Sequence, residues 1–259
     1  MKTILVPIDF QEASVRALRY VENVFNEQPV ELQLVNVVPV DNKVSDEDIQ
    51  KAFGEFEEKT LKGYPLAYRF SIIRGNLLEE LQRAIHFYRP SLVIIGTSGN
   101  LLTKALMKLT DCPVLIIPET SRKGKIRNIV YANDFNAVKS SAAFEPLADL
   151  SKRFDAKVHI IHINKDEYTP PDNAEASLEY YLQLIDHEYA SMKSDDLVAA
   201  LQDYVHRQDI DVLSVLLRDH GQNNLSSNGK LIEEIVNNVD IPVLSLVLIS
   251  NNWQKEGPV

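Results

Sequence analysis

The sequence repeats itself, and this repeat constrains the fold more than any other feature of the chain. The stretch Ile4–Phe10 (ILVPIDF) returns 125 residues later as Ile129–Phe135 (IVYANDF). Three further elements return in the same order: LQLVNV at 32–37 as VHIIHI at 158–163, LLEELQ at 77–82 as LVAALQ at 197–202, and PVL at 113–115 as PVL at 242–244. Agreement in order over four elements predicts two copies of one domain.

The two copies are expected at residues 1–120 and 126–250. A polar and basic stretch, Glu119–Arg127, separates them and is suited to an exposed linker. The chain has 259 residues, which is enough for two domains of ordinary size, each with its own core.

Within each copy, short β-branched runs alternate with amphipathic helical patterns. Strands are predicted at 3–9, 31–38, 67–73, 92–95 and 114–117 in the first copy. In the second they are predicted at 128–133, 157–163, 188–192, 211–217 and 242–248. Runs that are apolar on both faces, such as Leu92–Ile95, indicate a sheet covered by helices on both sides. The expected fold class is therefore α/β, with two tandem, doubly wound, parallel five-stranded sheets.

Composition narrows the classes of partner and compartment. The formal net charge is −10, which argues against a duplex nucleic-acid partner because phosphate binding needs clustered cations. No stretch resembles a signal peptide or a membrane span. The single cysteine, Cys112, precludes an intrachain disulfide and favours a reducing cytoplasm; it is expected to be a buried structural thiol.

Together these residues resemble the universal stress protein family. The resemblance rests on a first strand ending in Pro7-Ile-Asp9-Phe10, a fourth strand running into Gly96-x-x-Gly99, and a last strand that opens Cys112-Pro-Val-Leu. It covers nearly the whole chain. It implies a five-stranded parallel sheet with helices on both faces in each copy, the fold also typical of adenine nucleotide alpha hydrolases, and a protein that either binds ATP or lacks it.

The resemblance also implies where a nucleotide would bind. Acids that end the first strand contact adenine, together with a residue at the end of the second strand. In the ATP-binding members, ribose and phosphates are held by a loop that opens with Gly-x-x-Gly and closes, after nine further residues, with Gly followed by Ser or Thr. The matching positions in this chain are Asp9, Val37, Gly96 and Gly99 in copy one, and Asp134, Ile163, Gly229 and Lys230 in copy two.

Copy one lacks the closing half of the phosphate loop. Leu109 stands ten residues beyond Gly99, where the closing glycine is expected. The internal register agrees, because Val93 and Leu213 are displaced by 120 residues whereas Pro113 and Pro242 are displaced by 129. Copy two therefore holds nine extra residues, and copy one has lost the loop.

Copy two keeps the loop length but changes its chemistry. Leu216 and Asp219 occupy the positions of the opening glycines, Gly229 fits the closing glycine, and Lys230 replaces the hydroxyl residue. Side chains at 216 and 219 would crowd the backbone, and the Asp219 carboxylate would repel phosphate. Lys230 would compensate in part as a cation.

These observations predict a stress-response module with degenerate nucleotide sites, acting by regulation or protein interaction, with no catalytic residues and no resident cofactor. The alternative is an adenine nucleotide-binding protein with one surviving site for ATP or AMP. Asp9 stays open between two roles, an adenine-binding acid or a residue that caps the helix near Ser14. An unrelated α/β enzyme is the least favoured hypothesis, since Asp219, His220 and the Ser226-Ser227 pair have no geometry for hydrolysis.

No metal site is expected. His159 and His162 are three apart on a strand and face opposite sides of the sheet.

Strands that begin at Pro113 and Pro242 should lie at sheet edges, which need cover. In the family such edges pair two domains, so we expect intrachain domain pairing about a pseudo-twofold axis. Association into a homodimer of chains stays open. The helix Ser45–Lys62 is expected to be an amphipathic cover for the sheet, with a partner-docking face as the less favoured alternative.

Overall fold

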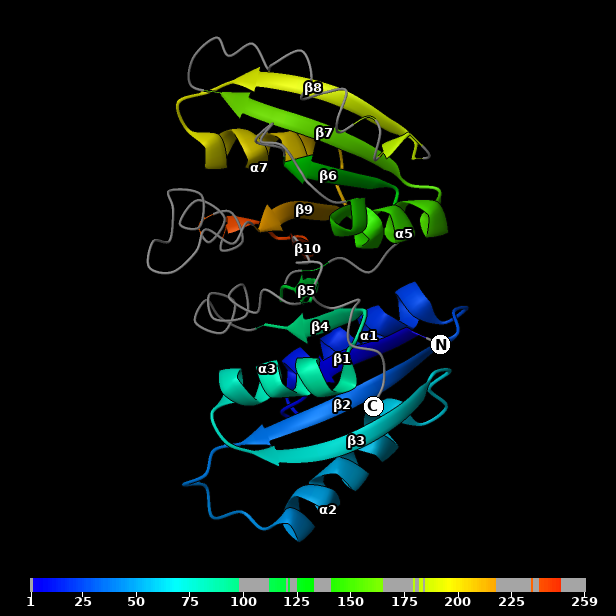
Figure 1. The fold of residues 1–259 in the computed structure, drawn as a ribbon, viewed down its shortest axis with the longest axis vertical. Coiled ribbons are helices and arrows are strands. Elements are labelled where there is room, and N and C mark those ends of the chain that lie inside the picture. The colour runs from blue at the N-terminus through cyan, green and yellow to red at the C-terminus, as the bar shows by residue number, and fades with distance from the viewer. Residues whose placement is uncertain are drawn as a thin grey trace. The chain divides into compact units, whose positions relative to one another are not determined.

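The computed structural model divides the chain into two compact units, Met1–Gly124 (unit 1) and Lys125–Val259 (unit 2). It describes residues 2–97, 112–119, 121, 125–132, 141–164, 179, 182–183, 185–217, 234 and 238–247. Each unit is a parallel α/β sheet, as expected, and the two are described separately (Figure 1).

Unit 1 contains five parallel strands in the order β3-β2-β1-β4-β5. Its elements are, in chain order, β1 (Lys2–Pro7), α1 (Glu12–Phe25), β2 (Val30–Val38), α2 (Asp46–Phe56), the π-helical turn η1 (Glu57–Leu61), β3 (Ala67–Arg74), α3 (Leu77–Tyr88), β4 (Leu92–Gly96) and β5 (Val114–Ile117). β1 is central, and every residue of β4 from Leu92 to Ile95 is buried.

Unit 2 repeats this arrangement, with the strand order β10-β9-β6-β7-β8 and all pairings parallel. Its described elements are β6 (Asn128–Ala132), the 3₁₀ turn η2 (Ser141–Phe144), α5 (Glu145–Phe154), β7 (Lys157–Asn164), β8 (His187–Lys193), α7 (Leu197–Arg207), β9 (Val212–Leu217) and β10 (Val243–Val247). The sequence-predicted strands are confirmed in both units to within two residues at each described end.

Helices cover both faces of the unit 1 sheet. The register pairs Ile4 with Leu92, so Gly96 shares the face of Ile4, and α1 packs on this face along β4. α2 lies on the same face beside β3 through the stacked rings of Phe53 and Phe70, whose centroids are 4.0 Å apart. α3 contacts β1 and β2 and crosses in front of these strands in Figure 1. The sheet is thus doubly wound.

Local signals explain where the helices begin and end. The side chains of Ser45, Asn76 and Asp196 accept backbone N–H groups at the N-termini of α2, α3 and α7. After α3 and α7 the chain turns through left-handed residues at equivalent places, Arg89 with φ 46° and Asp209 with φ 48°. The internal repeat therefore extends to backbone conformation.

Each unit carries an ion pair at the same place on its outer two strands, but with opposite polarity. In unit 1, Glu31 of β2 accepts from Arg69 of β3 at 2.6 Å. In unit 2, Lys157 of β7 binds Glu188 of β8. Both pairs run diagonally, because Gln33 opposes Arg69 and His159 opposes Glu188 in the two registers.

Candidate functional site

The candidate site lies at the carboxyl ends of the parallel strands, where α/β sheets bind ligands. In unit 1, Asp9 follows β1, Val37 is near the end of β2, and Gly96 ends β4. The strand order places β1 between β2 and β4, so the three residues lie at one edge of the sheet. Gly99, Asp134, Gly229 and Lys230 lie outside the described residues, as does Asp219.

Asp9 is engaged with the start of α1. Its Oδ1 accepts from the backbone N–H of Gln11 at 2.9 Å and from the Ser14 hydroxyl at 2.6 Å. The Asp9 N–H donates to Ser14 Oγ at 2.9 Å, which closes a reciprocal pair. Ser14 is buried, whereas Asp9 is exposed. The helix-capping role of Asp9 therefore has direct contacts in the structure, with Gln11 rather than Asp9 at the N-cap position.

Val37 is half-buried and opposes Ile73 of β3. The neighbouring Asn36 is buried, and its Nδ2 donates to the carbonyl oxygen of Ile8 at 2.7 Å. This bond ties the end of β2 to the segment between β1 and Asp9. The relative positions of Asp9 and Val37 are thus set by a buried side chain that sequence reasoning did not single out.

Gly96 is packed against α1. A Cβ at residue 96 would lie 1.8 Å from the carbonyl oxygen of Ala13 and 2.6 Å from its carbonyl carbon. Arg16, one turn further along α1, donates from Nη2 to the carbonyl oxygen of Thr97 at 3.2 Å. Glycine is required here because the helix backbone lies directly over the end of β4.

An aromatic cluster adjoins Asp9 on the side of α2. Phe10 has a left-handed backbone with φ 63°, and its ring lies 5.6–6.4 Å from those of Phe53, Phe56 and Phe70. Such separations are typical of stabilising ring pairs. The cluster anchors α2 against β3 and fixes the turn that carries Asp9.

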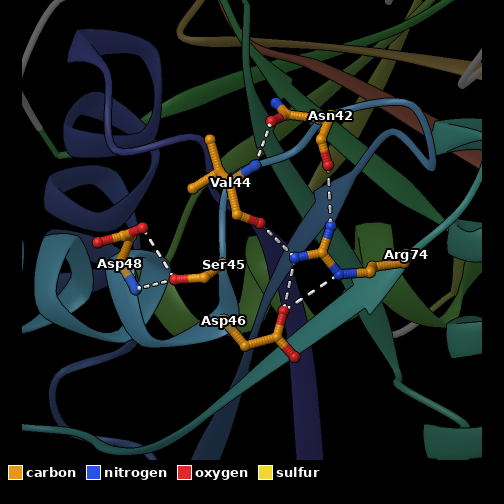
Figure 2. A network of polar contacts seen from close by, with 6 residues as sticks. All are labelled: Asn42, Val44, Ser45, Asp46, Asp48 and Arg74. Atoms are coloured by element: carbon orange, nitrogen blue, oxygen red, sulfur yellow. Dashed lines mark hydrogen bonds and ion pairs between the residues drawn. The ribbon is translucent and has the colours of Figure 1, made fainter.

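Arg74, the last residue of β3, holds the β2–α2 connection in place (Figure 2). Its guanidinium donates to Asp46 Oδ1 from Nε at 3.1 Å and from Nη2 at 2.7 Å, and also reaches the carbonyl oxygens of Asn42 and Val44. Asn42 Oδ1 in turn accepts from the N–H of Val44. One planar cation therefore shapes the loop beside the strand ends.

In unit 2 the described part of the equivalent edge is smaller. Ile163 is half-buried near the end of β7 and opposes Met192 of β8. Leu216, at the position that corresponds to Gly96, is a buried residue of β9 with 8% of its surface exposed. A bulky side chain thus stands where unit 1 has the glycine.

Further residues test other expectations of the sequence. Cys112 is buried and its Sγ lies 3.3 Å from the carbonyl oxygen of Pro90, which confirms a structural thiol. Among the described residues, no cluster of three or more His, Cys, Asp or Glu side chains could hold a metal ion. Within the same residues, no helix has the length and apolar character needed to cross a membrane.

The sequence pointed to Asp9 and Gly96, and it offered helix capping near Ser14 as one role of Asp9, but it did not indicate the contact that Gly96 makes. Ser14 is five residues after Asp9, a spacing that brings the first turn of a helix back to the preceding loop. Gly96 gave no signal for its contact with Ala13, because that contact joins residues far apart in sequence. Gln33 and His159 were detectable as polar residues at matching places in apolar strands.

Comparison with known proteins supports this description. Residues 1–118 match the model of the universal stress protein family. None of the curated proteins compared with this chain matches it in sequence. Among solved structures, a universal stress protein from Archaeoglobus fulgidus DSM 4304 is similar at a TM-score of 0.73 and 17% identity, with 95% of this chain and 98% of that chain covered.

Two other solved structures illustrate the range of similarity. A functionally unknown protein from Pseudomonas aeruginosa PAO1 aligns at a TM-score of 0.68 and 14% identity, over 96% of this chain and 93% of that chain. A universal stress protein in complex with cAMP aligns at 0.37 and 15% identity, over 45% of this chain and 96% of that chain. The first shows that the same fold extends over both units, whereas the second covers less than half of this chain.

Proposed function

We propose that this chain is a tandem stress-response module that acts without catalysis. The proposal starts from the match of residues 1–118 to the universal stress protein family. Its two domains, residues 1–120 and 126–250, present paired α/β surfaces for regulation or protein interaction. The module needs no resident cofactor, and the single cysteine suits the cytoplasm.

The observation that carries the proposal is the local engagement of two of the motif residues that unit 1 retains, Asp9 and Gly96. Asp9 Oδ1 accepts two hydrogen bonds from α1, and Gly96 accommodates the Ala13 carbonyl. Both residues therefore have structural roles that require no ligand. Their presence in the sequence is accounted for by the α1 contact, and it is not by itself a sign of nucleotide binding.

The loop sequences support the same conclusion. Unit 1 has lost the nine residues that would close a phosphate loop, and unit 2 has Leu216 and Asp219 in place of the opening glycines. A hydrogen bond to a charged group contributes roughly 1.5–3 kcal/mol. Loss of two or three such donors would cost about 3–9 kcal/mol, which corresponds to two to six decades in affinity.

Calorimetric titration of the full chain with ATP and with AMP tests the proposal. We expect no saturable heat at micromolar nucleotide in the native chain, in Asp9→Ala or in Asp134→Ala. Hydrolysis measured as phosphate release should equal that of a buffer blank. Micromolar ATP binding that disappears in either variant would overturn the proposal in favour of the nucleotide-binding alternative.

Regulatory partners can be sought with the same chain. Affinity purification with the full chain as bait, from stressed and unstressed cells, should enrich specific proteins. Added ATP should not change how well these proteins are retained by the bait. ATP-dependent retention would again favour a working nucleotide site.

A further inference from the structure

Unit 2 contains a buried polar cluster on the face covered by α7, away from the strand ends that form the candidate site. His159 of β7 is its centre, and 4% of the His159 surface is exposed. His159 contacts Asn128 of β6, Glu188 of β8 and the Tyr204 hydroxyl of α7. The four residues come from four different elements, and α7 packs on β7.

The orientation of Asn128 decides which ring nitrogen of His159 carries a proton. Asn128 Nδ2 donates to the carbonyl oxygens of Gln208 and Asp209 at 3.3 and 3.4 Å, so its Oδ1 faces the ring. His159 Nε2 lies 3.3 Å from that oxygen. Since Oδ1 only accepts hydrogen bonds, the Asn128 contact favours a proton on Nε2 of the neutral ring.

The remaining nitrogen, Nδ1, has two partners with conflicting demands. It lies 3.0 Å from the Tyr204 hydroxyl and 2.9 Å from Glu188 Oε1. In the neutral ring Nδ1 has a lone pair, which accepts from the Tyr204 hydroxyl and repels the carboxylate. In the imidazolium Nδ1 carries a proton, which binds the carboxylate and no longer accepts from Tyr204.

The charges around His159 come from β7, from β8 and from Asp186, the residue before β8. Glu188 is shared with Lys157 Nζ, and Asp186 lies in the β7–β8 connection. The adjacent His187 on β8 binds Glu179. Burial lowers the pKa of His159, as does the Lys157 charge, and together they outweigh the attraction of Glu188 and Asp186. The neutral, tyrosine-bound form is therefore the resting state near pH 7.

We propose that His159 is a proton-controlled junction between α7 and the outer strand β8. At neutral pH its Nδ1 accepts from the Tyr204 hydroxyl and holds α7 against β7. In acid, a proton from solvent adds to Nδ1, the new N–H donates to Glu188, and the bond to Tyr204 is lost. The covering helix α7 then loosens while the β7–β8 edge gains a charged hydrogen bond.

Unit 1 provides an internal control for this junction. Gln33 occupies the position of His159 in the repeat and is equally buried, with 4% exposed. Its Nε2 donates to Ser71 Oγ at 3.1 Å, and Ser71 Oγ lies 3.1 Å from the Tyr88 hydroxyl of α3. A glutamine side chain takes up no proton between pH 4.5 and 8. The contact between α3 and the sheet should therefore not respond to pH.

Two measurements on the full chain test the junction. Side-chain ¹⁵N spectra across pH 4.5–8 should show His159 protonated at Nε2 in the neutral form, with Nδ1 titrating below pH 6.5. The protection factors of the α7 amides (Leu197–Arg207) against hydrogen exchange should fall about fivefold on acidification through that titration. A change of this size is expected for the loss of one hydrogen bond. Protection of α3 (Leu77–Tyr88) should stay constant.

Variants separate the junction from general acid effects. His159→Gln copies the unit 1 residue and should abolish the pH response of α7 while keeping the cluster uncharged. Tyr204→Phe should abolish the response of α7 and move the Nδ1 titration to higher pH, because the neutral ring loses its donor. A pH response of α7 that persists in His159→Gln, or a neutral His159 protonated at Nδ1 in the native chain, would overturn the proposal.

Discussion

Gly96 and Ala13 are in direct backbone contact, since a Cβ added to residue 96 would lie 1.8 Å from the Ala13 carbonyl oxygen. This contact joins the end of β4 to the first turn of α1 and sets the spacing between Gly96 and Asp9. Glycine is therefore needed at position 96 for packing, whether or not a ligand binds there.

Replacement of Gly96 by alanine should therefore destabilise the fold. The neighbouring atoms belong to the Ala13 backbone, which cannot move aside without shifting α1, and overpacking of this kind costs about 1–3 kcal/mol. Gly54→Ala in α2 is the matched control, because nothing lies within 4 Å of its added Cβ and helix propensity improves by about 1 kcal/mol. Urea unfolding followed by circular dichroism should move in opposite directions for the two variants.

Asp9 and Ser14 should behave as one energetic unit. Asp9→Ala and Ser14→Ala each remove the 2.6 Å bond between the two side chains and should each cost about 0.5–2 kcal/mol. The loss of unfolding free energy in the double variant should be smaller than the sum of the losses in the two single variants. The difference, which is the coupling energy, should be about 0.5 kcal/mol or more. Asp41→Ala, an exposed acid on the β2–α2 connection, serves as the control; strictly additive losses would argue against the bond.

Arg74→Lys should loosen the β2–α2 connection although it keeps the charge. Lysine cannot reproduce the planar contact with Asp46 and the carbonyl oxygens of Asn42 and Val44. Trypsin cleavage after Lys43 should become several-fold faster, as expected for loss of about 1 kcal/mol of local stability. Arg69→Lys in β3, whose partner Glu31 lies on β2 and not in the β2–α2 connection, should leave cleavage at Lys43 unchanged.

His187 should make unit 2 less stable at alkaline than at mildly acidic pH. Burial disfavours its charge, but the Ile185 carbonyl and the Glu179 carboxylate outweigh burial and raise the pKa of His187. The folded chain thus holds a proton that the unfolded chain releases above about pH 6.5. This contribution is complete below pH 6.5 and is lost as pH rises through the folded pKa.

Substitution His187→Gln should remove that dependence. The difference in urea midpoint between the native chain and the variant should be larger at pH 6 than at pH 8.5. His159 acts in the opposite sense, because its lowered pKa makes acid destabilising below about pH 6.5. A His187→Gln variant with an unchanged pH profile would show that the Glu179 contact contributes nothing in solution.

The strands were predictable to within two residues because runs such as Leu92–Ile95 are apolar on both faces and end at turn residues. Helix capping near Ser14 was one of the two roles that the sequence left open for Asp9, and the structure shows that hydrogen bond. The contact of Gly96 with the Ala13 carbonyl could not be predicted, because it joins residues that are far apart in sequence. A motif position can satisfy a ligand pattern and a packing requirement with the same residue type.

The tyrosines linked to Gln33 and His159 show another limit of sequence comparison, since Tyr88 reaches Gln33 through Ser71 whereas Tyr204 contacts His159 directly. Tyr88 of α3 corresponds to Gln208 in the repeat, whereas Tyr204 lies one helical turn earlier. A turn is about 5.4 Å long, and a tyrosine side chain can cover that distance. Each unit thus links this strand position to a tyrosine of the covering helix, but the two tyrosines occupy positions that the 120-residue displacement does not pair.

The reversed polarity of the two diagonal ion pairs has a consequence for how a duplicated chain avoids misfolding. If β2 were to assemble beside β8, Glu31 would meet Glu188; if β7 were to assemble beside β3, Lys157 would meet Arg69. Like charges at such places oppose the wrong partnership, while each native pair attracts. Tandem domains are prone to exchanging equivalent segments during synthesis. In this chain, an exchange of outer strands between the two units would bring like charges together at the position of each ion pair.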